Sequence, residues 1–174
     1  MPVPSLGEGV RKKRELVVRR HVNAENARDF EAALATFEHP RYEYVATDEI
    51  FDGPDEVMAL WREQDRAFGD QHVEIVKLHS SDDAVLMEAV ARGKHAGAFR
   101  GLPPTGRSFE LPFLAIFVFE GEKLICERVY LDTGTLLREL GVAQDPLSLK
   151  GRLGTLVSHP LTIGRGAVRA VTGR

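Results

Sequence analysis

The segment Gly101–Ser108 comes closest in this sequence to a known phosphate-binding motif. It differs at one position from the pattern G-x-x-x-x-G-K-[S/T]. In a phosphate loop the glycines follow a strand and open a helix, whose backbone N–H groups then face the phosphates. Here the segment leads into a strand-like run, and Pro103 and Pro104 each lack one of those N–H groups. The segment therefore does not predict nucleotide binding.

The histidines and the cysteine form no recognisable metal or nucleophile motif. His72-Val73-Glu74 matches the H-x-E half of the zinc deaminase signature, but the other half needs two cysteines, and Cys126 is the only one. The histidines lack the H-E-x-x-H spacing, and there is no G-x-S-x-G elbow around a serine. Cys126 lies in an apolar run, which favours a buried, unreactive thiol. We therefore expect neither a metal nor another cofactor.

Apolar residues recur at helical spacing in the first half of the sequence and at strand spacing in the second half. Helices are expected over residues 11–27, 29–37 and 54–68, with a short strand over 41–46. Four strand-like runs and a short closing helix after Asp132 follow. Short turn-forming segments separate these runs, so neighbouring strands should pair antiparallel. The runs cover residues 72–79, 84–91, 108–119 and 123–131.

The run over residues 108–119 is apolar on both faces, which predicts that both faces of the sheet are covered. We expect helices on one face and a partner subunit or the C-terminal segment on the other. Successive side chains alternate between faces, so Glu127 and Arg128 should point in opposite directions. His21 lies on the apolar face of the first helix, where we expect a core histidine whose hydrogen bonds are satisfied.

The charge is distributed unevenly along the 174 residues. The net charge is −3, yet residues 1–24 carry +4, residues 146–174 carry +5 and residues 25–145 carry −12. A nucleic-acid-binding protein concentrates positive charge on its folded body, so we do not expect nucleic acid as a partner. We expect one domain over residues 1–141 and a basic extension over 142–174 that packs on the body or on a partner subunit. Contact of this extension with an anionic membrane is the less favoured alternative.

Features typical of secretion or membrane insertion are missing from the sequence. Its first ten residues lack the apolar core of a signal peptide, and four basic residues follow at 11–14. The longest apolar run, Leu111–Phe119, has nine residues, whereas a membrane-spanning helix needs about 20. A single cysteine also fits a reducing compartment. We therefore expect a cytoplasmic protein.

The most specific feature of the sequence is the segment over residues 93–107, which reads GKHAGAFRGLPPTGR. It resembles the signature G-x-H-x-G-x-F-x-G-x-P-P-T-G-R of the SnoaL-like polyketide cyclases, also called ester cyclases. The segment from Asp132 to Gly141 is similar to the closing D-x-x-x-L-L-x-Q-L-G of that family. The resemblance implies an α+β fold of the nuclear transport factor 2-like type, with a cone-shaped curved antiparallel sheet packed against N-terminal helices around a cavity. It also implies a homodimer formed through the open sheet face.

The resemblance further implies acid/base chemistry without a metal or cofactor. The family's cyclases close a ring by intramolecular aldol condensation, in which a carboxylate or imidazole removes a proton next to a carbonyl group. By resemblance, an acidic residue from the last strand lies at the pocket, which makes Asp132 the first candidate for the acid/base group. Its alternative role is that of a helix N-cap. His95 is the candidate partner acid, and its alternative role is to fix the signature loop through hydrogen bonds to backbone.

Further residues are candidates for lining the pocket. If Arg128, Tyr130 and Asp132 share the inner face of the sheet, they form a polar floor that holds a carbonyl or carboxylate group. Otherwise they face solvent or a dimer interface. The candidate substrate-binding residues are Tyr44, Trp61, Phe113, Arg128 and Tyr130.

Two functions are therefore open at this point. The first is an enzyme that performs acid/base chemistry on a small apolar carbonyl-containing molecule by ring closure, isomerisation or hydrolysis. The second is a non-catalytic ligand-binding or dimerisation module that uses the same pocket. An acidic group and a proton partner that converge in a dry cavity would favour the enzyme.

Overall fold

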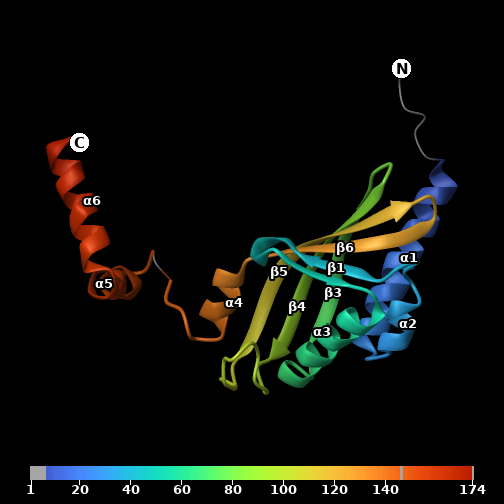
Figure 1. Cartoon of the computed structure of the whole chain (residues 1–174), viewed down its shortest axis with the longest axis horizontal. Helices are drawn as coiled ribbons and strands as arrows, with labels where there is room; N and C mark the ends of the chain where they lie inside the picture. Colours follow the sequence, from blue (N-terminus) through green and yellow to red (C-terminus); the bar gives the residue numbers. More distant parts are fainter. Residues whose placement is uncertain (1–6, 146, 174) are drawn as a thin grey trace.

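A curved sheet with helices over its concave face makes up most of the computed structural model, which describes residues 7–145 and 147–173 (Figure 1). The helices are α1 (Glu8–Asn26), α2 (Phe30–Leu34), α3 (Pro54–Ala67), α4 (Thr133–Glu139), α5 (Leu149–Ser158) and α6 (Pro160–Thr172), and a 3₁₀ turn, η1, spans Val45–Thr47. The strands are β1 (Arg41–Tyr44), β2 (Glu49–Asp52), β3 (His72–Ser80), β4 (Ala84–Lys94), β5 (Ser108–Glu120) and β6 (Lys123–Leu131). This is the α+β class that the sequence predicted.

The six strands pair in the order β2-β1-β6-β5-β4-β3. Neighbouring strands run antiparallel except β1 and β6, which run parallel to each other. The register shifts between Ile75 and Lys77 on β3 and between Val118 and Phe119 on β5, and such irregularities bend a strand and increase its twist. The sheet consequently curves without closing into a barrel, and its concave face can hold a cavity.

Helices α1 and α3 cover the concave face with one apolar side each. On α1 the buried positions include Val18, His21 and Val22, which follow the helical spacing. On α3 they include Leu60 and Trp61, and the helix begins at Pro54, where a missing N–H group costs nothing. Both helices lie where the sequence placed them, within a few residues at each end.

The main core lies between these helices and the inner side chains of the strands. Phe117 on β5, Met87 on β4 and Leu124 on β6 are fully buried there against Val18 and Leu60. A second, smaller apolar cluster forms at the other end of the sheet around Phe68, Phe109, Leu111 and Leu140. The cavity described below lies between residues of these two clusters.

The C-terminal extension forms two helices. Helices α5 and α6 contact each other and stand apart from the sheet (Figure 1). Their apolar side chains, among them Leu149, Leu153 and Leu161, are exposed. Packing of the extension on the body is therefore not seen, and packing on a partner subunit stays a prediction. None of the helices in residues 7–145 and 147–173 has both the length and the hydrophobicity of a bilayer-spanning segment.

Candidate active site

A cavity of about 200 Å³ opens between the concave face of the sheet and helices α1 and α3. Most of its wall is apolar and aromatic, which suits a small molecule with little charge. Polar and charged side chains also line it, among them three glutamates, two glutamines, two tyrosines, two arginines and one aspartate. The residues that matter below are Glu25, Phe30, Tyr42, Tyr44, Trp61, Gln64, Phe113 and Glu127.

A cluster of three ionisable side chains lies at this cavity. His21 and Glu25 stand one turn apart on α1, so their side chains share one face of the helix, and Glu127 reaches them from β6. The Nε2 atom of His21 lies 3.1 Å from Oε2 of Glu127 and 3.4 Å from Oε1 of Glu25. His21 is fully buried and Glu127 is only 2% exposed. Glu25 and Glu127 line the cavity, so a molecule inside it can reach both carboxyl groups.

The orientation of the His21 ring follows from its other nitrogen. The hydroxyl of Thr36 donates a hydrogen bond to the carbonyl oxygen of Ala33 at 2.6 Å. That hydroxyl is therefore free to accept, and Nδ1 of His21 donates to it at 2.7 Å. The proton thus sits on Nδ1 in the neutral ring, which leaves Nε2 to face the two glutamates.

The cluster shifts the protonation of its members. Burial alone would lower the pKa of His21, but the charges of Glu25 and Glu127 outweigh it and raise the pKa to about 10. Burial raises the pKa of Glu127 to about 7, while His21 and Tyr42 act in the opposite direction. Because the two groups are in direct contact, their protons belong to the pair rather than to either residue. A buried carboxyl that titrates near neutral pH is suited to acid/base chemistry.

Two tyrosines, a tryptophan and a glutamine supply further polar groups of the cavity residues. Tyr42 faces Glu127 in the register of β1 and β6, and burial raises the pKa of Tyr42 well above its usual value. The side-chain amide of Gln64 donates to the hydroxyl of Tyr44. The indole N–H of Trp61 is buried and has no hydrogen-bond partner among the described residues. Trp61 as a residue lines the cavity.

Three of the substrate-binding residues predicted from sequence do line the cavity. Tyr44 reaches it from β1, Trp61 from α3 and Phe113 from β5. Tyr44 and Phe113 are partly buried against the main core, and Trp61 is part of it. The structure therefore brings these three together.

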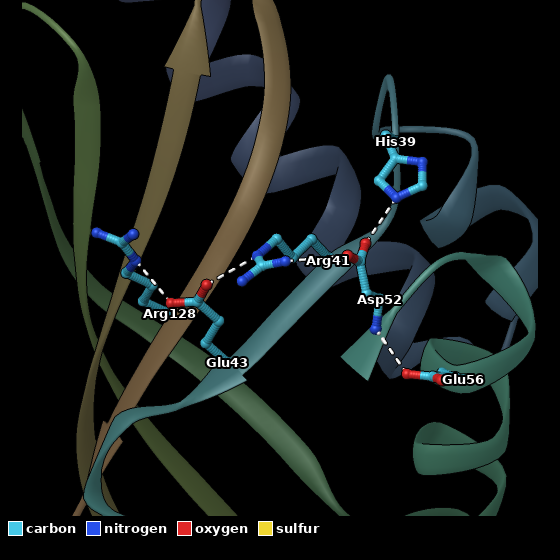
Figure 2. A network of polar contacts seen from close by, with 6 residues as sticks. All are labelled: His39, Arg41, Glu43, Asp52, Glu56 and Arg128. Atoms are coloured by element: carbon cyan, nitrogen blue, oxygen red, sulfur yellow. Dashed lines mark hydrogen bonds and ion pairs between the residues drawn. The ribbon is translucent and has the colours of Figure 1, made fainter. Parts of the chain in front are cut away.

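Arg128 and Tyr130 lie on the opposite, convex face of the sheet. Arg128 donates to Glu43 at 2.8 Å, and Glu43 also accepts from Arg41 at 2.8 Å (Figure 2). Tyr130 is 41% exposed. On β6 the inward positions are those of Glu127 and Val129. The geometry thus matches the alternative in which Arg128 and Tyr130 face solvent or a dimer interface.

Asp132 takes the N-cap position of α4. Its carboxylate accepts from the N–H of Gly134 at 2.9 Å and from the hydroxyl of Thr135 at 2.5 Å. The hydrogen bond from Thr135 contributes most to lowering the pKa of Asp132. The side chain is 64% exposed and does not line the cavity. The geometry thus matches the capping alternative, and a catalytic role of Asp132 stays a prediction from sequence.

His95 also matches its alternative role. The ring is fully buried, and its Nδ1 accepts from the backbone N–H of Thr105 at 3.2 Å. The backbone of His95 bonds to Arg107 and Gly106 across the base of the signature loop. His95 contacts Phe68 but does not itself line the cavity. It fixes the loop that closes one end of the cavity, and a role as proton partner is likewise untested.

Sequence reasoning missed the cluster of His21, Glu25 and Glu127. The expectation for His21 was a satisfied core histidine, yet its Nε2 has no aligned hydrogen bond. The available signal was one ionisable residue among apolar neighbours in each of two elements: His21 on the apolar face of α1, and Glu127 two residues before Val129 on β6. Such a residue in one element is common, and only the fold reveals that the two face each other.

A concave sheet closed by helices, with ionisable groups buried at an apolar cavity, defines a class of small α+β proteins with a cavity inside the fold. The family model of the SnoaL-like polyketide cyclases matches residues 15–140. The match spans well over half of the chain, and the chain belongs to this family. A comparison with curated proteins finds no match.

Solved structures of other proteins share the fold. A proposed SnoaL-like polyketide cyclase from Jannaschia sp. CCS1 has a TM-score of 0.72 at 18% identity, over 81% of this chain and 99% of that one. The phenazine biosynthesis-related protein PhzB2 from Pseudomonas aeruginosa has a TM-score of 0.69 at 20% identity, over 87% and 95% of the two chains. A protein from Catenulispora acidiphila with a ketosteroid isomerase-like fold, in complex with trimethylamine, has a TM-score of 0.63 at 21% identity, over 72% and 92%. These similarities confirm the predicted nuclear transport factor 2-like fold.

Proposed function

We propose that this protein is an acid/base enzyme that acts on a small apolar carbonyl-containing molecule by ring closure, isomerisation or hydrolysis. One observation carries the proposal: the carboxyl group of Glu127, 2% exposed, lies at an apolar cavity beside His21 and Glu25. Glu127 is the group that removes and returns the proton. His21 is a positioning residue, because its contact with Glu127 holds that carboxyl in place.

The chemistry needs few groups. A proton next to a carbonyl is already acidic, and a carboxylate that titrates near neutral pH can remove it. The negative charge that develops on the carbonyl oxygen needs a donor in a dry site. Trp61 is the candidate donor, because it lines the same cavity and its indole N–H has no partner among the described residues. The apolar walls hold the substrate so that its reacting parts meet, which lowers the barrier through positioning.

A non-catalytic ligand-binding module is the second candidate. The unpartnered Trp61 N–H favours it as much as it favours the enzyme, because a bound carbonyl oxygen would satisfy that donor without any reaction. The two functions differ in what Glu127 does. In the enzyme the carboxyl transfers a proton, whereas in the module it only shapes the pocket.

The proposal is tested by the exchange of acidic protons. A panel of aromatic keto esters is incubated with the protein in D₂O, and the loss of the proton next to the carbonyl is followed by proton NMR. The wild type should accelerate exchange for at least one ester, and Glu127→Gln should lose at least about 100-fold of that rate. Glu43→Gln is the matched control, because Glu43 faces the convex side of the same sheet. If both variants and the wild type exchange protons at equal rates and still bind ligand, the enzyme proposal fails and the non-catalytic binding module is favoured.

We further propose a homodimer through the convex face of the sheet. The outward side chains of β5 support this, because Leu114, Ile116 and Val118 are apolar and half-buried on a face that no helix covers in Figure 1. Sedimentation of the wild type should give twice the chain mass. A charged residue in place of Ile116 should give a monomer, and a wild type that sediments as a monomer at micromolar concentration would contradict the proposal.

A further inference from the structure

We propose that His21, Glu25 and Glu127 form a binding site for a divalent first-row transition metal ion, with Zn²⁺ as the best match. The site lies at the wall of the cavity, and the inference rests on its geometry rather than on the proposed reaction.

The spacing of the three ligand atoms fits a metal ion. In a tetrahedral zinc site with bonds of about 2.0 Å, neighbouring ligand atoms lie about 3.3 Å apart. Nε2 of His21 lies 3.1 Å from Oε2 of Glu127 and 3.4 Å from Oε1 of Glu25. One ligand atom from each residue lies within 4.8 Å of the others. Small rotations of the carboxyl groups would bring all three to one centre.

The relative orientation of His21 and Glu127 also supports an ion between them. Although Nε2 of His21 and Oε2 of Glu127 are close, both are buried and neither has a hydrogen-bond partner in the described part of the chain. The carboxylate oxygen therefore lies off the axis along which Nε2 donates or accepts. Two buried polar atoms at this distance, not aligned with each other, are the arrangement of two ligands of one ion. Buried polar atoms without partners are rare and require an explanation.

The surroundings of His21 match those of a metal ligand. A metal-bound histidine commonly donates its second ring N–H to an oxygen atom, which fixes the tautomer and the ring plane. His21 does this through Nδ1 and the hydroxyl of Thr36, and Thr36 is itself anchored on the carbonyl of Ala33. The neutral ring consequently presents the lone pair of Nε2 to the two glutamates.

Charge and access also fit. The ion pairs found for Glu25 and Glu127 in residues 7–145 and 147–173 both lead to His21. Metal binding would displace the proton from Nε2 of His21, and the two carboxylates beside the neutral imidazole would then balance a dication. Glu25 and Glu127 line the cavity, so the ion has a route of entry, and its remaining coordination positions would face the cavity. An imidazole ligand favours zinc and similar ions over Mg²⁺.

A bound metal ion would alter the acid/base site. The ion would occupy the carboxyl oxygen through which Glu127 handles a proton, so we expect it to inhibit the proton exchange described above. Metal binding and exchange are measured separately, and either can fail while the other holds.

The test uses the full chain, stripped with EDTA and dialysed, then titrated with ZnCl₂ by isothermal titration calorimetry. We expect one ion per chain, and an affinity at least about tenfold weaker in Glu25→Gln and in Glu127→Gln. Titration with Co²⁺ should give visible absorption bands of a low-symmetry site that both variants lose. Glu25 is partly exposed, so its variant should fold, and circular dichroism verifies this.

The exposed pairs His39–Asp52 and His79–Glu88 serve as controls, because each could bind zinc at the surface. His39→Ala and His79→Ala should leave the affinity unchanged. The inference is overturned if the wild type takes up no zinc. That result is expected if a water molecule, rather than a metal ion, lies between the three side chains. The inference is also overturned if the surface variants lose the ion while Glu25→Gln and Glu127→Gln keep it. If zinc fails to bind but Glu127→Gln still abolishes exchange, the proposed function stands without the metal.

Discussion

Tyr42 on β1 lies directly opposite Glu127 on β6 in the parallel ladder that joins the two strands. The next pair in the same ladder is Glu43 with Arg128. Because successive side chains point to opposite faces, this register places Tyr42 and Glu127 at the cavity and the ion pair of Glu43 with Arg128 on the convex side. A shift of β6 by one residue would exchange the faces of Glu127 and Arg128. Arg128 would then point into the cavity, and the cavity would lose its buried carboxyl group.

This pairing predicts the effect of Tyr42→Phe. Tyr42 acts to lower the pKa of Glu127, so removing its hydroxyl should raise the pKa of that carboxyl further. The pH profile of the proton exchange should therefore move to higher pH, while the phenyl ring keeps the packing. Rates are compared from pH 5 to 9 in the two proteins. A profile that moves to lower pH would show that the tyrosine hydroxyl does not favour the ionised carboxyl.

The buried carboxyl also predicts a pH dependence of stability in EDTA-treated protein. The folded pKa of Glu127, about 7, lies above its ordinary value of 4.5, so the folded state holds this proton more tightly than the unfolded state. The contribution is present at low pH and is lost as pH rises towards 7. Relative to Glu127→Gln, the wild type should lose up to about 1.4 kcal/mol of unfolding free energy per pH unit in this window. Urea unfolding at several pH values measures it.

On the convex side of the sheet, Glu43 contributes to stability with the opposite pH dependence. Burial opposes the ionisation of Glu43, but hydrogen bonds from Arg41 and Arg128 outweigh it and lower the pKa of Glu43 below its ordinary value. Its contribution is present above about pH 4.5 and is lost as pH falls through the lowered pKa. Glu43→Gln should therefore flatten the acid side of the stability curve and leave the window between pH 5 and 7 as in the wild type. An effect confined to the neutral range would contradict these assignments.

The free N–H of Trp61 predicts an uncommon combination of effects. A buried donor without a partner costs stability, so Trp61→Phe should keep or slightly raise the thermal unfolding temperature, although it removes atoms from the core. The same change should weaken the binding of a carbonyl ligand by about tenfold, because the bound oxygen loses its donor. Thermal unfolding and ligand titration are measured side by side. Undiminished affinity would mean that the ligand does not use this donor.

The cap position of Asp132 predicts a loss of stability. Asp132→Ala removes the acceptor for the N–H of Gly134 and should cost about 1 kcal/mol. Asp132→Asn keeps an acceptor oxygen and should cost less. Chemical unfolding of both variants measures these values. If Asp132→Asn abolished proton exchange at unchanged stability, the catalytic role inferred from the family resemblance would be restored.

The sequence predicted the elements of the fold better than the site that they form. Apolar spacing located α1, α3 and the four long strands, because each buries one side against the core. Strand β2 was missed, since Glu49–Asp52 is short and lies at the sheet edge with alternate side chains exposed. Arg128 was placed in the pocket because spacing alone cannot tell which face of a strand is concave. Glu127 was overlooked for the same reason.

The parallel pairing of β1 with β6 has a consequence for how the protein is made. The partners Glu43 and Arg128 are separated by 85 residues along the chain, whereas the other paired strands are consecutive in the sequence. During synthesis the chain therefore exposes α1, with His21 and Glu25, long before the strand that carries Glu127 leaves the ribosome. Contacts of such long range close late and slow folding. We therefore expect the cavity wall that holds the ionisable groups to form late in folding, when β6 pairs with β1.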